Sequence, residues 1–257
     1  MEMLVSFIVC FLAGTAAGLG TGFAGMSAAA AITPILVTFL NVEPYQAVGI
    51  ALASDVLASG VSAYTYGKNK KLDIKNGLVM MITVLIFTAV GSWVSSLVPS
   101  RTMGNFSVIM TMLLGVKFIV KPVMTTKNKM ETLDLKNRVI RSVASGVLIG
   151  FICGFVGAGG GMMMLLVLTT VLGYELKTAV GTSVFVMAFT AFTGAVSHFA
   201  IGGMPNMWYM AVCVLSTLLW ARIAAKIANK SSALTLNRVT GVILVVIGAS
   251  ILAVNLL

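Results

Sequence analysis

Charged residues are scarce in this chain: they make up 9% of its 257 residues, against about 25% in a typical soluble domain. The few charges gather in short stretches between long uncharged runs, and 59% of the residues are hydrophobic. This pattern excludes a soluble globular domain and predicts a polytopic helical membrane protein, so the lipid bilayer is an expected partner. The net charge of +10 is explained by membrane topology, because the basic residues lie in loops and at helix ends, and we expect no nucleic-acid partner.

Residues that carry catalysis or bind metals are also few. The only histidine is His198, and Cys10, Cys153 and Cys213 have no metal-binding spacing. The sequence contains no H-E-x-x-H motif, no suggestive intramembrane Ser/His pair and no paired carboxylates within one half. We therefore expect no enzyme activity, no metal and no cofactor. Without a P-loop, transport would not be powered directly by ATP hydrolysis in this chain.

The apolar runs predict an all-α protein with about ten transmembrane segments. They cover about residues 3–22, 27–40, 45–66, 76–98, 103–121, 139–157, 159–172, 177–199, 207–228 and 235–255. The longest hydrophilic stretch is predicted to be a cytosolic linker. It divides the chain into a first repeat (1–121), the linker (122–138) and a second repeat (139–257), with five segments in each repeat.

The two halves match when the sequence is shifted by 132 positions. Gly14, Gly18, Gly22, Phe23, Gly25, Glu43 and Ala47 to Gly49 then fall on Gly146, Gly150, Gly154, Phe155, Gly157, Glu175 and Ala179 to Gly181. Glycine matches alone would be weak evidence, but the match continues through the glutamates and the Ala-Val-Gly triplet. If every segment crosses, an odd number of segments per unit makes the second repeat inverted relative to the first.

The distribution of basic residues decides between two topologies. With ten crossings and a cytosolic linker, all of the 17 basic residues except Arg101 are cytosolic. If segments 2 and 7 were re-entrant, Lys177 and the basic residues of segments 9 and 10 would be external. The first topology is therefore preferred, in a cell (inner) membrane protein with both termini outside.

Segments 2 and 7 are short, and each follows a glycine cluster. About 14 residues of helix cover about 21 Å, less than the roughly 30 Å of a hydrocarbon core. Short, glycine-interrupted segments at matching positions of inverted halves indicate a transporter binding site. The free N–H groups of two facing helix N-termini would suit an anion. The residues concerned are Gly25 and Ser27 in the first half and Gly157, Gly159, Gly160 and Gly161 in the second.

Close helix packing is the alternative role for glycines in membrane helices. Gly14, Gly18 and Gly22, with Gly146, Gly150 and Gly154, are spaced by four residues, and packing is the preferred interpretation for these six. For the glycines of the two turns, a role in binding or turning is preferred.

The second half resembles the TauE/SafE sulfite exporter family, also called the sulfonate uptake permeases. The resemblance rests on the glycine-rich turn at 157–161, on Ala-Val-Gly-Thr-Ser at 179–183, and on a helix that ends at His198 before a short glycine loop. The first half departs from the pattern, since it has "GMSAAAA" at 25–31 and Ile50-Ala51 where Thr-Ser would stand. The resemblance implies a transporter of sulfur-containing anions and organic acids.

Four further side chains are candidates for function. Asp55 is the one carboxylate deep inside a segment; it could couple a proton or cation to anion movement, or be a structural residue bonded to serines. His198 is either an interfacial residue or a second coupling candidate. Thr182 and Ser183 either contact substrate or bond to their own backbone.

The sequence therefore predicts a secondary transporter of a small anion, sulfur-containing or a small carboxylate. Access to the site would alternate as one repeat rocks against the other. The alternative is a non-transport membrane module, such as an assembly partner or an intramembrane enzyme subunit. A homo-oligomer is left open by the sequence.

Overall fold

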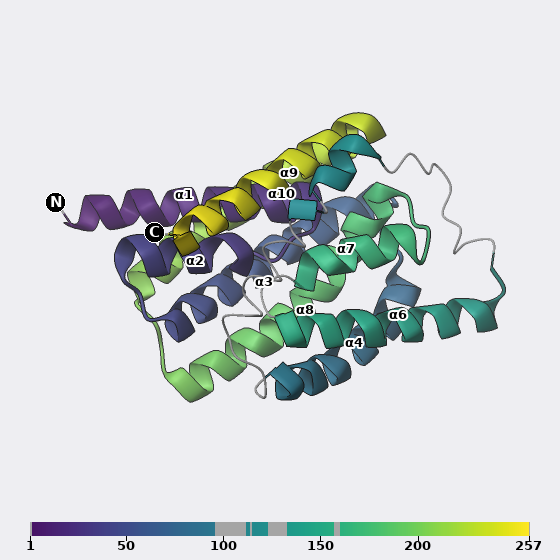
Figure 1. Ribbon diagram of the computed structural model, residues 1–257, viewed down its shortest axis with the longest axis horizontal. Coiled ribbons are helices and arrows are strands. Elements are labelled where there is room, and N and C mark those ends of the chain that lie inside the picture. The colour runs from purple at the N-terminus through teal and green to yellow at the C-terminus, as the bar shows by residue number, and fades with distance from the viewer. Residues whose placement is uncertain (1, 96–111, 114, 123–132, 157–159, 257) are drawn as a thin grey trace.

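A computed structural model of the chain describes residues 2–95, 112–113, 115–122, 133–156 and 160–256, and this part is helical, with no strand. The helices are α1 (Glu2–Ala24), α2 (Ala29–Leu40), α3 (Pro44–Lys68), α4 (Ile74–Ser95), α6 (Leu135–Val156), α7 (Gly160–Thr170), α8 (Leu176–Gly202), α9 (Met207–Lys230) and α10 (Ala233–Leu256). Residues 115–120 are helical as well. Figure 1 shows the helices lying along the long axis of the molecule.

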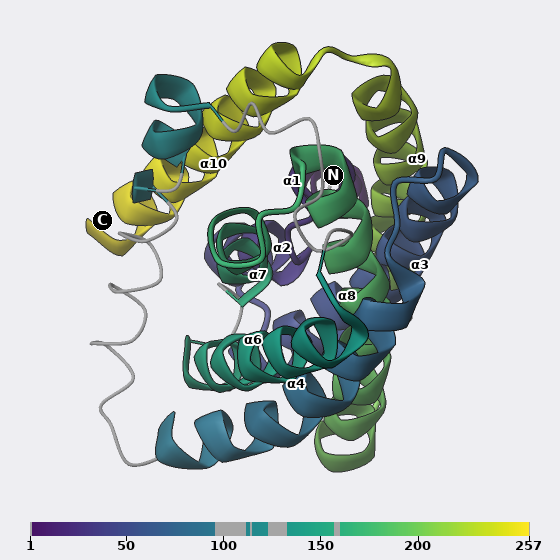
Figure 2. The ribbon, with the colours of Figure 1, turned by 90° about the vertical axis from the view of Figure 1, so that its right-hand side faces the viewer.

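Five of the described helices, α1, α3, α8, α9 and α10, are long and apolar enough to span a membrane. This confirms the prediction of a multi-pass helical membrane protein. The predicted short segments are separate helices, α2 with 12 residues and α7 with 11. At 1.5 Å per residue each is about 16 to 18 Å long, so neither can cross a hydrocarbon core of about 30 Å alone. In Figure 2, α2 and α7 both lie near the centre of the bundle.

The two short helices end in the same way. Asn41 follows α2 with φ of 50°, and Gly173 follows α7 with φ of 68°. Few residues other than glycine, asparagine and aspartate adopt this left-handed conformation. The residue after each of these two, Val42 or Tyr174, donates its N–H to the carbonyl six residues earlier, at 3.2 Å after α2 and 3.0 Å after α7. The chain therefore turns sharply after each short helix and enters a long one.

Glycines bring α1 into close contact with α9. A Cβ atom added to Gly18 would lie 2.6 Å from the carbonyl oxygen of Thr217, and one added to Gly22 would lie 2.6 Å from that of Ala221. Such distances are shorter than van der Waals contact, so only glycine fits there. The contacts advance along both helices in the same direction, which makes α1 and α9 parallel.

A matching contact joins α6 to α4. A Cβ atom at Gly146 would lie 2.9 Å from the carbonyl oxygen of Met80, and one at Gly150 would lie 2.6 Å from that of Val84. These two helices are also parallel. The packing interpretation thus holds for Gly14, Gly18, Gly22, Gly146 and Gly150; the surroundings of Gly154 lie outside the described part of the chain.

The direction of these pairs follows from α3 and α8, which pack antiparallel. Gly49, near the start of α3, lies beside Phe199 near the end of α8, since a Cβ atom there would be 3.1 Å from that ring. At the other end, Lys71 after α3 forms an ion pair with Glu175 before α8. We call this the Lys71 end of the bundle. Because α4 follows α3 and α9 follows α8, α4 begins at the Lys71 end and α9 at the opposite end. The α1–α9 and α4–α6 pairs therefore run in opposite directions.

Candidate functional site

The turn between α1 and α2 is the centre of a buried polar region. Gly25 ends α1 with φ of +61°, where a side chain would be strained, and its N–H bonds to the carbonyl of Thr21 at 2.9 Å. The hydroxyl of Thr21 donates to the carbonyl of Met26 at 2.9 Å. The glycine-rich sequence allows this sharp break, and the threonine satisfies one of the carbonyls that the break leaves free.

Three other helices supply hydroxyl groups to the end of α1. Tyr66 of α3 donates to the carbonyl of Gly22 at 2.9 Å, and Ser183 of α8 donates to that of Gly25 at 2.9 Å. Thr240 of α10 donates to the carbonyl of Phe23 at 3.3 Å. The last carbonyls of a helix have no partner within the helix, and in an apolar interior each needs one. These contacts hold the break at a fixed place between three helices.

The carboxylate of Asp55 lies at the N-terminus of α2. Asp55 is the twelfth of the 25 residues of α3 and is 1% exposed. It accepts a hydrogen bond from the hydroxyl of Ser59 at 2.8 Å, and the Ser27 hydroxyl and the Ala28 N–H lie close enough to stabilise its charged form. Two of these three donors belong to the residues just before α2. The helix N-terminus that the sequence predicts as an anion site thus lies beside an acidic group of the chain itself.

A stripe of buried polar side chains continues from Asp55 along α3. Ser59, Ser62 and Tyr66 follow at helical spacing, and each has no exposed surface. The hydroxyl of Ser62 has no hydrogen-bond partner among the described residues. A buried hydroxyl without a partner is unfavourable by about 1–3 kcal/mol, so its presence needs an explanation. The stripe leads toward the Lys71 end, because α3 ends there at Lys68.

The structure brings together four of the predicted residues. Gly25, Ser27, Asp55 and Ser183 belong to this one region, although the sequence assigns Asp55 to a role separate from the turn. Thr182, also buried, accepts a hydrogen bond from the backbone N–H of Asp73 at 3.2 Å and so contacts the connection after α3.

The remaining candidates lie elsewhere. His198 contacts the carbonyl of Gly194 at 3.0 Å and lies beside Gly49, six residues before Asp55 on α3. Gly160 and Gly161 begin α7, while Gly157 and Gly159 lie outside the described residues. Among the described residues no cluster of histidine, cysteine, aspartate or glutamate is suited to hold a metal ion.

A second polar cluster, which the sequence did not reveal, lies at the Lys71 end. Tyr174 donates to the carboxylate of Asp73 at 2.8 Å, and Lys177 donates to the carbonyl of Asn229 at 2.8 Å. Burial, and secondarily the charge of Asp73, raises the pKa of Tyr174 above its usual value. The Lys71–Glu175 ion pair and the Tyr174–Asp73 hydrogen bond join the connection before α4 to the connection before α8, and the Lys177 contact joins α8 to α9.

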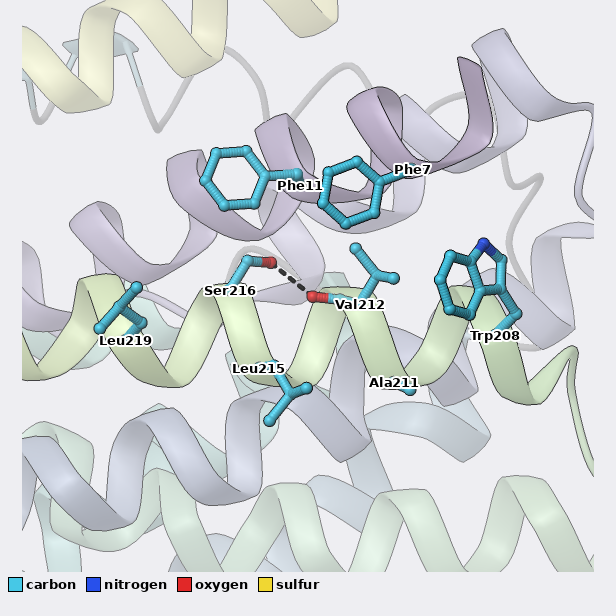
Figure 3. Close-up of a pocket in the computed structure, with 8 residues that line it drawn as sticks. All are labelled: Phe7, Phe11, Trp208, Ala211, Val212, Leu215, Ser216 and Leu219. Carbon is cyan, nitrogen blue, oxygen red and sulfur yellow. Dashed lines mark hydrogen bonds between the residues drawn. The ribbon is translucent and has the colours of Figure 1, made fainter. Parts of the chain in front are cut away.

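An apolar groove of about 300 Å³ runs along α1 and α9 (Figure 3). Its walls are Phe7, Phe11, Trp208, Ala211, Val212, Leu215, Ser216 and Leu219. The hydroxyl of Ser216 is bonded to the carbonyl of its own helix at Val212, 2.7 Å away. The residues that line this groove carry no charge and are mostly apolar, so the polar region around the α1–α2 turn is the stronger candidate site.

Comparison with known proteins agrees with this architecture. The chain is 25% identical to "Probable membrane transporter protein YunE" of Bacillus subtilis over 98% of both chains. It is 24% identical to a probable membrane transporter protein of Methanocaldococcus jannaschii, over 93% of this chain and 91% of the relative. No solved structure matches. The family model described as "Sulfite exporter TauE/SafE" matches residues 10–251, so this chain belongs to the TauE/SafE sulfite exporter family and is a multi-pass membrane transporter.

Proposed function

We propose that this protein is a secondary transporter that moves a small anion across the cell membrane by alternating access. The substrate is a sulfur-containing anion, sulfite or an organosulfonate, or a small carboxylate. The observation that carries the proposal is the carboxylate of Asp55 at the N-terminus of α2, midway along a membrane-spanning helix. It indicates that this helix end attracts an anion inside the bundle, as free N–H groups and the helix dipole predict.

The two halves act as inverted repeats of five segments, residues 1–121 and 139–257, joined by the linker 122–138. Three observations support this organisation. Glycine contacts join α1 to α9 and α6 to α4. In the proposed repeats α6 is the equivalent of α1, and α9 is the equivalent of α4, so the two contacts correspond to each other. The left-handed residues Asn41 and Gly173 are 132 positions apart, the same shift that aligns the sequences. The two glycine-packed pairs also run in opposite directions.

The sides of the membrane follow from the charges. Lys71 pairs with Glu175, so the ends of α3 and α8 that carry them lie on one side. A re-entrant segment 7 after a crossing segment 6 would separate these ends by the thickness of the membrane. The positive-inside rule makes the Lys71 end cytosolic, with both termini outside.

The helices that move together come from both halves. The glycine contacts between α1 and α9, and between α4 and α6, are too close to slide without a clash. One moving body therefore contains α1 with α9, and the other contains α4 with α6. This refines the expectation that one sequence half rocks against the other.

Binding and transport can be tested separately. Purified protein is heated with sulfite, thiosulfate, sulfoacetate, taurine or acetate, because a ligand of the native state adds stability as RT ln(1 + [L]/Kd), about 2.7 kcal/mol at 100 Kd. The anion that raises Tm is then followed into liposomes that contain the protein. A well-folded sample that responds to none of these anions, and carries none, would favour the alternative of a non-transport membrane module.

A further inference from the structure

We propose that Asp55 couples anion binding to proton uptake by competing with the substrate for the N-terminus of α2. The inference rests on the proposed anion transport and states how that same site is regulated. In the described state the carboxylate occupies the helix end. A substrate anion enters when Asp55 takes up a proton and leaves its donors free.

Asp55 and a substrate anion would use the same donors. The hydroxyl of Ser27 and the N–H of Ala28 lie beside Asp55, close enough to stabilise its charge, and both precede the first turn of α2. These are the groups that a substrate anion would need at this helix end. One set of donors cannot serve two anions at once, and two negative charges at contact distance in an apolar interior repel each other strongly. Binding of the substrate therefore requires a neutral Asp55.

No charged group in the part of the chain that the structure describes compensates Asp55. Its interactions among the described residues are with Ser27, Ser59 and the backbone of Ala28, and all three are neutral. Four helices pack against α3, and of these α2 has no ionisable residue. The ionisable residues of the other three are Glu2 and Cys10 on α1, Lys177 and His198 on α8, and Tyr209, Cys213, Arg222, Lys226 and Lys230 on α9. His198 and Lys177 bond to backbone carbonyls elsewhere, and the thiol of Cys213 bonds to the carbonyl of Cys10. A proton is then the means by which Asp55 becomes neutral.

The buried hydroxyls of α3 offer a route for that proton. Ser59 bonds directly to Asp55, and Ser62 lies one turn further along the same face of α3, fully buried and without a partner among the described residues. A free hydroxyl can accept a proton on one lone pair and donate its own to the next group. The stripe continues to Tyr66, close to the cytosolic end of α3. The proton moves along these hydroxyls to the carboxylate oxygen, which becomes a neutral carboxyl group, and no other bond changes.

The test measures anion affinity against pH with thiosulfate, whose charge is constant from mildly acidic to mildly alkaline solution. In the native protein, the affinity should fall by about tenfold for each pH unit over which Asp55 is ionised, since one proton is taken up with each anion. Calorimetry in two buffers of different ionisation enthalpy should show that proton directly. Asp55→Asn removes the charge and keeps the shape, so it should bind thiosulfate tightly at every pH.

The outcomes separate this inference from the proposed function. If neither protein binds any of the five anions at any pH, anion transport itself is refuted. If the native protein binds thiosulfate with no pH dependence and no proton uptake, transport stands and the coupling is refuted. A folded Asp55→Asn protein that has lost binding would also overturn the competition. If Asp55→Asn does not fold, the calorimetry of the native protein still decides.

The proton route has its own measurement. Liposomes that contain the protein and a pH-sensitive dye report proton entry driven by an anion gradient. Ser62→Ala should slow this entry several-fold. Gly60→Ala is the matched control on the same helix, because nothing lies within 4 Å of a Cβ atom there. Equal rates in the two variants would overturn the route through Ser62, and a requirement for sodium at constant pH would overturn the proton as the coupled ion.

Discussion

Lys71, in the connection between α3 and α4, forms an ion pair with Glu175, which lies 104 positions further along the chain and directly before α8. The lysine side chain is 36% exposed and the glutamate 15%. The pair therefore joins two connections at the surface of the bundle, where charges are partly screened by water. The pair matters because it joins the connection before α4 to the connection before α8, at the Lys71 end of the bundle.

A charge exchange tests this ion pair. Lys71→Glu places two acids together and should lower the free energy of unfolding by up to about 1 kcal/mol, with a matching loss of Tm. The double variant with Glu175→Lys should recover most of the loss, because the attraction is restored with reversed polarity. Thermal unfolding of the four proteins gives the coupling energy. If the double variant loses the sum of the two single effects, the residues do not interact.

Stability at alkaline pH should depend on Tyr174. Because its pKa is raised in the folded state, its contribution is complete below the ordinary tyrosine pKa of about 10 and is lost as the pH rises beyond it. Native protein should therefore lose Tm more steeply above that pH than Tyr174→Phe, which has no ionisable group there. Parallel pH curves for the two proteins would show that Tyr174 ionises as freely in the folded state as in the unfolded one.

Gly25→Ala should damage both stability and transport. The positive φ and the hydroxyl of Ser183, 2.8 Å from the position of a new Cβ atom, each oppose the substitution. We expect a loss of about 1–3 kcal/mol. Gly60→Ala is the comparison, since it adds the same methyl group within a helix and meets nothing there. Chemical unfolding and anion uptake per molecule measure the two effects, and a native-like Gly25→Ala protein would contradict the role of the turn.

Two glycine-to-leucine substitutions should behave differently. Gly150→Leu forces a side chain onto the backbone of Val84, so yield and Tm should fall, with activity lost in proportion to protein. Gly160 is the first residue of α7, and Gly160→Leu should leave a folded protein that no longer transports. Yield, Tm and uptake per molecule distinguish the two. Full activity per molecule in Gly160→Leu would show that the start of α7 takes no part in transport and would leave Asp55 and its hydroxyl neighbours as the whole site.

The topology can be read by labelling from each side. In a background without native cysteines, a thiol at Leu256→Cys should react with an impermeant reagent added outside intact cells. A thiol at Asp134→Cys, in the linker, should react only after the cells are opened. Labelling of position 256 only from the cytosol would reject the arrangement with both termini outside.

The helices were largely predictable from the sequence, and the contacts between them were not. Apolar runs locate a helix because each segment must satisfy its own backbone in lipid. The break at Gly25 was also foreseeable, since a cluster of glycines with no charge marks a turn. Asp55 was singled out because a carboxylate is costly at that depth.

What the sequence could not reveal is which residue meets which. Asp55 and Ser27 were predicted as parts of different functions, because nothing local shows that α3 returns past the start of α2. Thr240 bonds to a carbonyl 217 positions away, and threonines in membrane helices usually bond to their own helix. The cluster at Lys71 was missed for a similar reason, as loop charges are normally solvated.

The contact between α1 and α9 has a consequence for synthesis of the chain at the ribosome. The contact between α4 and α6 joins helices closer together in the sequence, and can form when about three fifths of the chain has been made. The glycine face of α1, in contrast, leaves the ribosome first and meets Thr217 only when α9 is inserted near the end of translation. A nascent chain that is cut or stalled before α9 leaves α1 without its partner, which exposes an incomplete molecule to cellular quality control.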